Sequence, residues 1–382
     1  TSPMPMEVVM AENNRFHDQI VGTGPFKLGK WNRGSKLVMN QFENYRGGVY
    51  PSQGDRVANS RDLLKDAGKE IPFLKKIVFH VIKNDQTRWL NFMNDKVGYL
   101  DIPKDNYSSA IEPSGDIKKQ LKQKNVQLQV VPTLTYWWLS FNMEDPILGG
   151  EENLDLRKAI AHAINIDRYI NVFTNNVGQK ANSIYPPGIP GYDPSTRLPY
   201  GHNLKKAKEY LKKAGHPNGK GLPTLTFDLR ASNTASRQRG EFIKRQLDKI
   251  GIDVKIVLNT FPTFLKKSRT EQLQFWLDGW SLDYPDAENV LQLLITKNHA
   301  PGPNATNYSN PKFDRLFNEL KYLRNGEKKF ELMQKMENIV HQDLPWVMLY
   351  YSRDYILYHD YIKNYRPSDI IYNYMKYIRL DK

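Results

Sequence analysis

A carboxylate set between aromatic residues is the feature of this sequence with the clearest chemical meaning. Residues 280–284 read Trp-Ser-Leu-Asp-Tyr, so Trp280 and Tyr284 flank the acidic Asp283, and Ser281 lies beside them. An ionised carboxylate in a dehydrated pocket needs a cation, and aromatic walls strengthen that ion pair. We therefore predict that Asp283 anchors a cationic group of a ligand, with Trp280, Ser281 and Tyr284 as its neighbours.

These residues also have structural alternatives. Asp283 could cap a helix that begins near Ala287, although Asp286 is better placed for that role. Trp280 and Tyr284 could equally belong to the hydrophobic core. The sequence leaves both alternatives open.

Two apolar and aromatic segments, at 133–142 and 344–353, contain further candidate ligand-binding residues. Side chains alternate between the two faces of a strand, so residues 136 and 138 share a face and the residue between them points the other way. The candidates are Tyr136 and Trp138 in the first segment and Tyr350 and Tyr351 in the second.

No pattern in the sequence predicts a catalytic centre. It contains no HExxH, GxSxG, GxxxxGK or strand-linked GxGxxG motif. Cysteine is absent, which removes thiolate catalysis and cysteine-ligated zinc. The histidines are scattered. His17 and His341 could bind a metal in a nickel-type site, but a surface or capping role is the simpler interpretation. We expect neither an enzyme nor a bound cofactor.

The composition is that of a globular protein too long for one ordinary core. The 382 residues are 40% hydrophobic and 25% charged, and lysine or arginine interrupts every apolar stretch well before the roughly 18 residues of a membrane span. The net charge is +14, but the basic residues are spread along the chain with acidic residues nearby, as on solvated helix faces. No nucleic-acid-binding motif accompanies them, so we expect no nucleic acid partner.

Strand and helix patterns alternate along the chain, which predicts an α/β fold with mixed sheets. Asp85 is the expected N-cap of one helix, and Gly215 and Gly251 are expected to end two others. We expect strands at 36–42, 73–82, 96–102, 225–230, 252–258 and 346–351, and helices at 86–94, 153–174, 204–214, 236–250, 311–323 and 328–342.

Two lobes follow from this organisation. The chain is expected to leave the first lobe at the first aromatic segment and to return at the second. Lobe one then comprises 1–135 plus 350–382, and lobe two comprises 136–349. Two crossing segments between lobes make a hinge.

Six segments, in order along the chain, resemble the family 5 extracellular solute-binding proteins, which include the oligopeptide, dipeptide and nickel binders of ABC importers. Each motif is weak alone, and their common order makes the signal strong. The segments are 22–28 (GTGPFKL), 44–48 (NYRGG), 87–102 (TRWLNFMNDKVGYLDI), 139–143 (LSFNM) with 155–168 (DLRKAIAHAINIDR), 279–289 (GWSLDYPDAEN) and 307–314 (NYSNPKFD).

The resemblance implies a two-lobe periplasmic-binding-protein clamshell of the type II, cluster C-like kind. It implies an extracytoplasmic protein, periplasmic or at the cell surface, that binds peptides in a cleft between lobes and delivers them to the permease subunits of an ABC importer. In peptide binders of this family the aspartate that matches Asp283 pairs with the ligand's α-ammonium group. The family also offers main-chain groups near Tyr350 and Tyr351 to the ligand.

The sequence departs from the family pattern in two places. Family members carry well over a hundred residues before the segment at 22–28, whereas this chain has 21. The N-terminal part of lobe one is therefore expected to be absent, and the chain to be either a fragment or completed by a separate N-terminal segment. Some members also place an arginine just before the GW element to meet a ligand carboxylate, where this chain has Phe275-Trp-Leu-Asp278.

That second departure keeps other functions open. The same fold could bind an oligosaccharide, a nickel complex or an opine. A DNA-linked regulatory module is a further alternative, although the sequence contains no helix-turn-helix segment.

Overall fold

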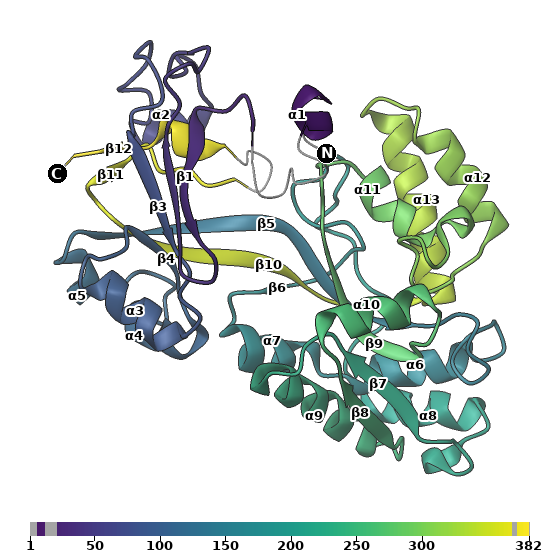
Figure 1. The fold of residues 1–382 in the computed structure, drawn as a ribbon. Coiled ribbons are helices and arrows are strands. Elements are labelled where there is room, and N and C mark those ends of the chain that lie inside the picture. Colours follow the sequence, from purple (N-terminus) through teal and green to yellow (C-terminus); the bar gives the residue numbers. More distant parts are fainter. Residues whose placement is uncertain (1–5, 12–20, 369–372, 382) are drawn as a thin grey trace. The chain divides into compact units, whose positions relative to one another are not determined.

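The structure, a computed structural model, describes residues 6–11, 21–368 and 373–381 (Figure 1). The two longest strands are β5 (Val126–Phe141) and β10 (Trp346–His359). Inside these two strands lie the boundaries of two compact units. Unit 1 is Thr1–Val131 with Tyr355–Lys382, and unit 2 is Pro132–Asp354.

Unit 1 contains a small antiparallel sheet with the strand order β1-β2-β3. Its β4 pairs antiparallel with the last part of β10, with Leu100 opposite Leu357. The strands of unit 1 are β1 (Phe26–Asn32), β2 (Lys36–Gln41), β3 (Lys76–His80), β4 (Tyr99–Asp101), β11 (Ile362–Lys363) and β12 (Arg379–Leu380). Its helices are α1 (Met6–Ala11), α2 (Arg56–Ser60), α3 (Asp85–Met93), α4 (Tyr107–Ala110) and α5 (Lys119–Lys122).

Unit 2 is built on a mixed sheet in the order β5-β9-β7-β8. The strand β7 runs parallel to β8 and β9, whereas β5 runs antiparallel to β9. Its further strands are β6 (Gln179–Lys180), β7 (Leu225–Leu229), β8 (Val254–Leu258) and β9 (Phe275–Ser281). Its helices are α6 (Leu154–Ala163), α7 (Ile166–Thr174), α8 (Leu204–Lys213), α9 (Thr234–Asp248), α10 (Phe261–Arg269), α11 (Glu288–Leu291), α12 (Pro311–Leu320) and α13 (Glu327–Asp343).

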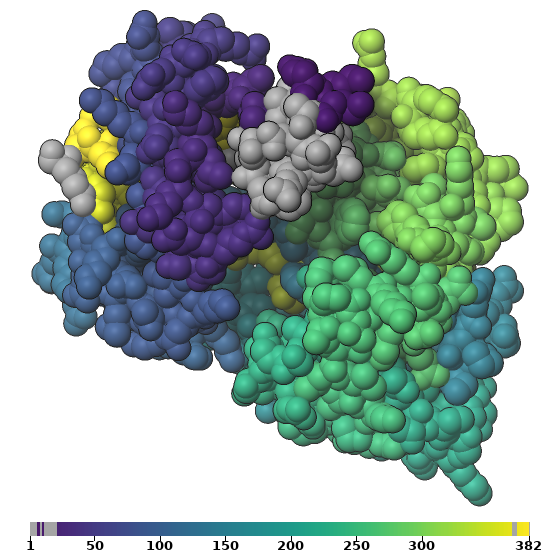
Figure 2. All heavy atoms as spheres, viewed as in Figure 1, coloured from purple at the N-terminus to yellow at the C-terminus, as the bar shows by residue number. Residues whose placement is uncertain are grey.

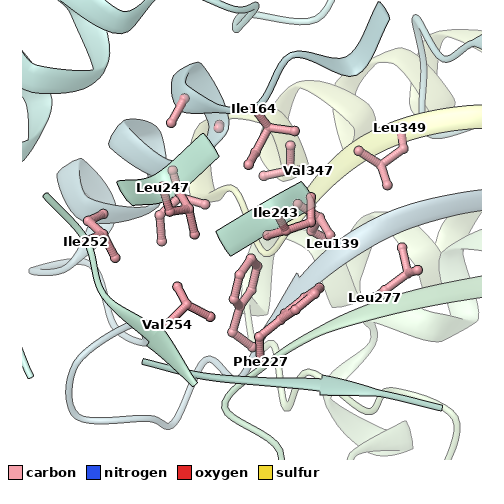
Figure 3. Close-up of a cluster of buried hydrophobic side chains, with 14 of the residues drawn as sticks. Leu139, Ile164, Phe227, Ile243, Leu247, Ile252, Val254, Leu277, Val347 and Leu349 are labelled. Atoms are coloured by element: carbon pink, nitrogen blue, oxygen red, sulfur yellow. The ribbon is translucent and has the colours of Figure 1, made fainter. Parts of the chain in front are cut away.

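Both faces of β5 are buried in unit 2. Odd-numbered residues such as Leu139 lie in one hydrophobic cluster with Phe227 of β7 and Leu247 of α9 (Figure 3). Even-numbered residues such as Tyr136 and Trp138 lie in a second cluster, to which α12 and α13 also contribute. Figure 2 shows these two helices, in yellow-green, together at the surface of the molecule. The alternation expected of residues 136 and 138 is therefore confirmed.

Two predicted helix boundaries were wrong for local reasons. Asn84, rather than Asp85, caps α3, because its side chain accepts a hydrogen bond from Thr87 N at 2.8 Å. The helix expected at 153–174 is two helices, and the chain is extended at Ile164 between them. Asn165 then caps α7 by accepting from Arg168 N at 2.9 Å, which fixes a new helix start inside the apolar pattern.

None of the helices in the described part of the chain is long and apolar enough to cross a membrane.

The buried arginine of α6 holds three loop carbonyls of unit 2. The Arg157 guanidinium donates to Leu148 O at 2.6 Å, to Gly150 O at 2.7 Å and to Asp343 O at 2.8 Å. The side chain is 1% exposed, and burial lowers the pKa of Arg157 to about 10, so the group keeps its charge at neutral pH. It joins the loop that precedes α6 to the end of α13.

We expect Arg157→Met to lower the free energy of unfolding of unit 2 by about 3 kcal/mol or more, because it leaves three buried carbonyls without donors. Urea unfolding followed by circular dichroism measures the change. The matched control is Arg168→Met, which removes an exposed arginine from α7 and should cost less than about 0.5 kcal/mol. Equal effects of the two substitutions would contradict this role of Arg157.

Candidate ligand-binding site

A pocket of about 380 Å³ lies in unit 2 where the parallel strands β7 and β9 end. Ligands of α/β proteins bind outside the carboxyl ends of parallel strands, because the loops that follow these strands diverge there. Aromatic, basic and acidic side chains share the pocket. They include Trp138, Trp280, Phe261, Arg230, Arg269 and Asp278.

Arg230, the first residue after β7, is held between two aromatic rings. Its guanidinium lies 4.7 Å from the ring centre of Trp137 and 5.8 Å from that of Phe261. Its Nη1 lies 3.7 Å from Asp278 Oδ1 and donates to Gly279 O at 3.4 Å. The long distance to Asp278 makes this a weak ion pair, so the guanidinium keeps donors for another carboxylate.

Asp278 is the acidic group of the pocket. Trp276 Nε1 donates to its Oδ2, and Gly279 N donates to its Oδ1, both at 2.9 Å. Burial raises the pKa of Asp278 above its ordinary value, and these two hydrogen bonds and Arg230 oppose that rise. Ionisation of this carboxyl group is therefore less favourable here than it is in water.

The loop after β9 is organised by one buried amide, that of Asn289. Its Oδ1 accepts from Trp280 Nε1 at 2.9 Å and from Asp283 N at 3.2 Å. Its Nδ2 donates to Asp283 Oδ2 at 3.4 Å. Asn289 is 1% exposed, so it fixes the indole that lines the pocket and the predicted anchor Asp283 in one geometry.

Asp283 itself is exposed, and no described cation forms an ion pair with it. The structural role considered for it belongs to Asp286. The Oδ1 of Asp286 accepts from Glu288 N at 2.9 Å, at the start of α11, and its Oδ2 pairs with Lys329 at 2.7 Å. Asp283 is therefore left available as an acceptor for a cation of a ligand.

Ser281 and Tyr284, two predicted neighbours of the anchor Asp283, lie at the surface. Ser281 Oγ is 2.7 Å from Thr135 Oγ1 across the β5–β9 ladder. Tyr284 is 42% exposed, and its hydroxyl donates to the Glu288 carboxylate. Neither of these residues lines the pocket, and Asp283 does not line it either, so a ligand would have to extend beyond the pocket to contact them.

The remaining four predicted residues are buried. Tyr136 is stacked on Trp138 with ring centres 4.9 Å apart, and of these four only Trp138 lines the pocket. The Tyr351 hydroxyl donates to Ser183 O at 2.7 Å and accepts from Ser183 N at 2.9 Å. Tyr350 is stacked on Trp137 with ring centres 6.2 Å apart. Their contacts are core contacts, and the ligand-binding role of these residues stays a prediction.

No group of three or more metal-binding side chains occurs in the described part of the chain. His341 is partly buried, and this burial lowers its pKa to about 4. His17 lies outside the described residues.

Two residues of the site were missed from the sequence. Arg230 is the last residue of the strand predicted at 225–230, and strand pairing places it beside Asp278, because Asp228 lies opposite Trp276 in the parallel ladder. Asn289 is the last residue of the GW segment and has no pattern of its own. A charged residue at the carboxyl end of a predicted parallel strand was the one available signal.

The fold is that of two-lobe solute-binding proteins. A solved structure of the ABC transporter-associated periplasmic binding protein DppA from Helicobacter pylori, in complex with the peptide STSA, is similar with a TM-score of 0.77 and 28% identity, covering 98% of this chain and 67% of that one. The oligopeptide-binding protein AppA from Bacillus subtilis, solved with a nonapeptide, has a TM-score of 0.76 at 18% identity and covers 100% of this chain and 72% of that one.

The chain belongs to the bacterial extracellular solute-binding proteins of family 5, because the model of this family's middle region matches residues 1–302. Curated relatives include the oligopeptide-binding protein OppA of Bacillus subtilis, 24% identical over 92% of this chain and 60% of the relative. The heme-binding protein A of Haemophilus influenzae is 25% identical over 92% of this chain and 58% of the relative. The chain thus spans about 60% of the length of these relatives.

The raised pKa of Asp278 predicts a pH effect on stability. A carboxyl group whose pKa is higher in the folded than in the unfolded state contributes stability at low pH and loses it as the pH rises through the folded value. When the pH is raised from about 4 to about 7, the free energy of unfolding of Asp278→Asn should therefore increase relative to that of the natural chain. Urea midpoints of both proteins at the two pH values measure this difference. The opposite trend would show that the Arg230 contact outweighs burial.

Proposed function

We propose that this chain is the solute-binding component of an ABC importer and that it binds peptides at the pocket of unit 2. The observation that carries the proposal is that Trp280 lines the pocket with a basic residue and is joined, through one buried amide, to an acidic residue outside the lining. Asp283 and Trp280 are fixed by the same amide, and Trp280 and Arg230 line the same pocket. A zwitterionic ligand has the complementary pair of charges.

The chemistry of the two ends differs. The exposed Asp283 carboxylate can accept hydrogen bonds from an α-ammonium group. These hydrogen bonds are stronger than neutral ones because both partners are charged. The planar guanidinium of Arg230 packs against the rings of Trp137 and Phe261, and its free N–H donors suit a carboxylate. The apolar surfaces of Trp138 and Trp280 lie in the same pocket and suit the side chains of a peptide.

The names of relatives support peptides as the ligand class. They include oligopeptide-, dipeptide- and glutathione-binding proteins. Non-peptide ligands also occur among relatives and structural neighbours, such as the heme-binding protein A and the protein AgaA, which was solved with agropinic acid. The opposite charges at Asp283 and Arg230 favour a peptide, since both termini of a peptide find a partner.

The same proposal covers location and partners. An extracytoplasmic chain, periplasmic or at the cell surface, would present its bound peptide to the permease subunits of the importer. Binding and release without chemical change is sufficient for that task, so we propose no catalytic activity.

Asp283→Asn should weaken the binding of a short peptide with a free amino terminus by more than tenfold, on the order of 1.5–3 kcal/mol for a charge-assisted contact. Isothermal titration calorimetry with the peptide and with its N-acetylated form measures the effect. The acetylated peptide, which has no ammonium group, should bind both proteins equally. The matched control is Asp253→Asn, which removes an exposed carboxylate elsewhere in unit 2. Unchanged affinity of Asp283→Asn for the free peptide would exclude the anchoring role.

Arg230→Met should have the complementary selectivity. It should lower the affinity for a peptide with a free carboxyl terminus by at least tenfold. The affinity for the C-terminally amidated form should hardly change, because only the carboxylate loses a charged partner. Arg237→Met, at an exposed position of α9, is the control. If oligosaccharides, nickel complexes or opines stabilise the chain in a thermal-shift panel and peptides do not, the peptide proposal fails.

A further inference from the structure

One wall of the pocket of unit 2 is a single face of α10. The residues of this helix that line the pocket recur at spacings of three and four, and they are Phe261, Phe264, Leu265, Ser268 and Arg269. Residues with this spacing lie on one side of a helix. The pocket therefore runs along α10, from its first residue to its last.

The first residue of α10 is a large apolar side chain that the protein itself leaves half uncovered. Phe261 is 50% exposed, whereas Phe264, one turn further on, is 4% exposed and packs with Trp276 in a small hydrophobic cluster. In the described part of the chain, Phe261 belongs to none of the hydrophobic clusters. Its described ring contact is with the Arg230 guanidinium. The Phe261 ring thus offers apolar surface to an occupant of the pocket.

The rest of the lining is also largely apolar and aromatic. Trp280 is half-buried, and its indole is held in place because Nε1 donates to Asn289 Oδ1 at 2.9 Å. Trp138 and Trp346 are each 3% exposed, with ring centres 4.5 Å apart. Leu293, Pro301 and Pro303 complete the apolar part of the lining. An occupant therefore meets aromatic surface from α10 and from the sheet.

The charges of the lining favour an uncharged side chain in the pocket. The charged lining residues are Arg230, Arg269 and Asp278. Arg269 is exposed, and no described carboxylate forms a salt bridge with it. A ligand carboxylate at Arg230 would bring the summed charge of lining and ligand to zero. An acidic or a basic side chain would then add an uncompensated charge beside apolar walls, which is unfavourable.

We propose that this pocket takes the side chain of the ligand's C-terminal residue and selects an aromatic one. The inference rests on the proposed peptide-binding function and gives that function a substrate class. With the α-carboxylate at Arg230, the side chain of the same residue extends along α10, in contact with Phe261 and Trp280. Aromatic rings attract one another in stacked and edge-to-face arrangements, and the guanidinium of Arg269 favours the face of a ring.

An aliphatic side chain fits this pocket less well for two reasons. The pocket encloses about 380 Å³, which is more than an aliphatic side chain fills. The space left over would cost contacts with the surrounding rings. An aliphatic side chain also has no π-system, so it gains nothing from the quadrupoles of the tryptophans or from the charge of Arg269.

The test titrates the full chain with peptides of two to six residues that carry alanine at every position except the last. Isothermal titration calorimetry compares phenylalanine, cyclohexylalanine, glutamate, lysine and alanine at that position. At the length that binds most tightly, the peptide ending in phenylalanine should bind at least tenfold more tightly than those ending in alanine, glutamate or lysine. It should also bind at least threefold more tightly than the cyclohexylalanine peptide, whose side chain has a similar size but no aromatic face.

Substitutions of Phe261 complete the test. Phe261→Ala should reduce the ratio of the affinities for the phenylalanine and alanine peptides to less than about threefold, whereas Phe261→Tyr keeps the ring and should keep the ratio. Both peptides have the same terminal carboxylate, so any change in the surroundings of Arg230 cancels in this ratio. Tyr322→Ala, which removes an aromatic ring that is 81% exposed elsewhere in unit 2, is the matched control and should leave the ratio unchanged.

The outcomes separate this inference from the function on which it rests. Equal affinities for the phenylalanine and alanine peptides, or tighter binding of the glutamate or lysine peptide, would overturn the inference and leave the proposed function standing. A ratio that Phe261→Ala does not change would also overturn it. Binding of none of the peptides would overturn both.

Discussion

The register of β5 against β9 is the constraint on which unit 2 depends. It places Tyr136 opposite Trp280 and Trp138 opposite Asp278. Because side chains alternate with a period of two, a slip of one residue would turn Trp138 out of its cluster and bring Leu139 into its place. Both faces of β5 are buried, so such a slip would disrupt two hydrophobic clusters at once. The position of every pocket residue on β9 is therefore fixed by the packing of both faces of β5.

The parallel ladder transmits this order to the charged groups. Asp228 lies opposite Trp276, which brings the residue after β7 level with the middle of β9. Arg230 thus lies beside Asp278, although 47 residues lie between them in the sequence. The aromatic rings on either side of Arg230 come from β5 and α10. The surroundings of this guanidinium therefore depend on the correct placement of four elements, β5, β7, β9 and α10.

Local and periodic features were predictable from the sequence, and features that depend on pairing were not. The shared face of Tyr136 and Trp138 and the end of α8 before Gly215 follow from side-chain alternation and helix capping. The break at Ile164 was missed because apolar residues continue through it, and only the cap at Asn165 marks the new helix. Arg230 was missed because its role depends on a partner strand, which no local pattern specifies. Asn289 was missed because a buried amide has no periodic signature.

The attachment of the two charges to separate elements has a consequence for ligand length. Asp283 follows β9 in a loop held by Asn289, whereas Arg230 is attached to the end of β7. The sheet fixes the separation of these elements, so a flexible loop cannot adjust one charge toward the other. Under the proposed function, a ligand charged at both ends would therefore meet both groups only within a limited range of spacings of its termini. Shorter or longer homologues would each leave one terminus in water, which makes the number of backbone bonds in the ligand, rather than its side chains, the first quantity that this site would distinguish.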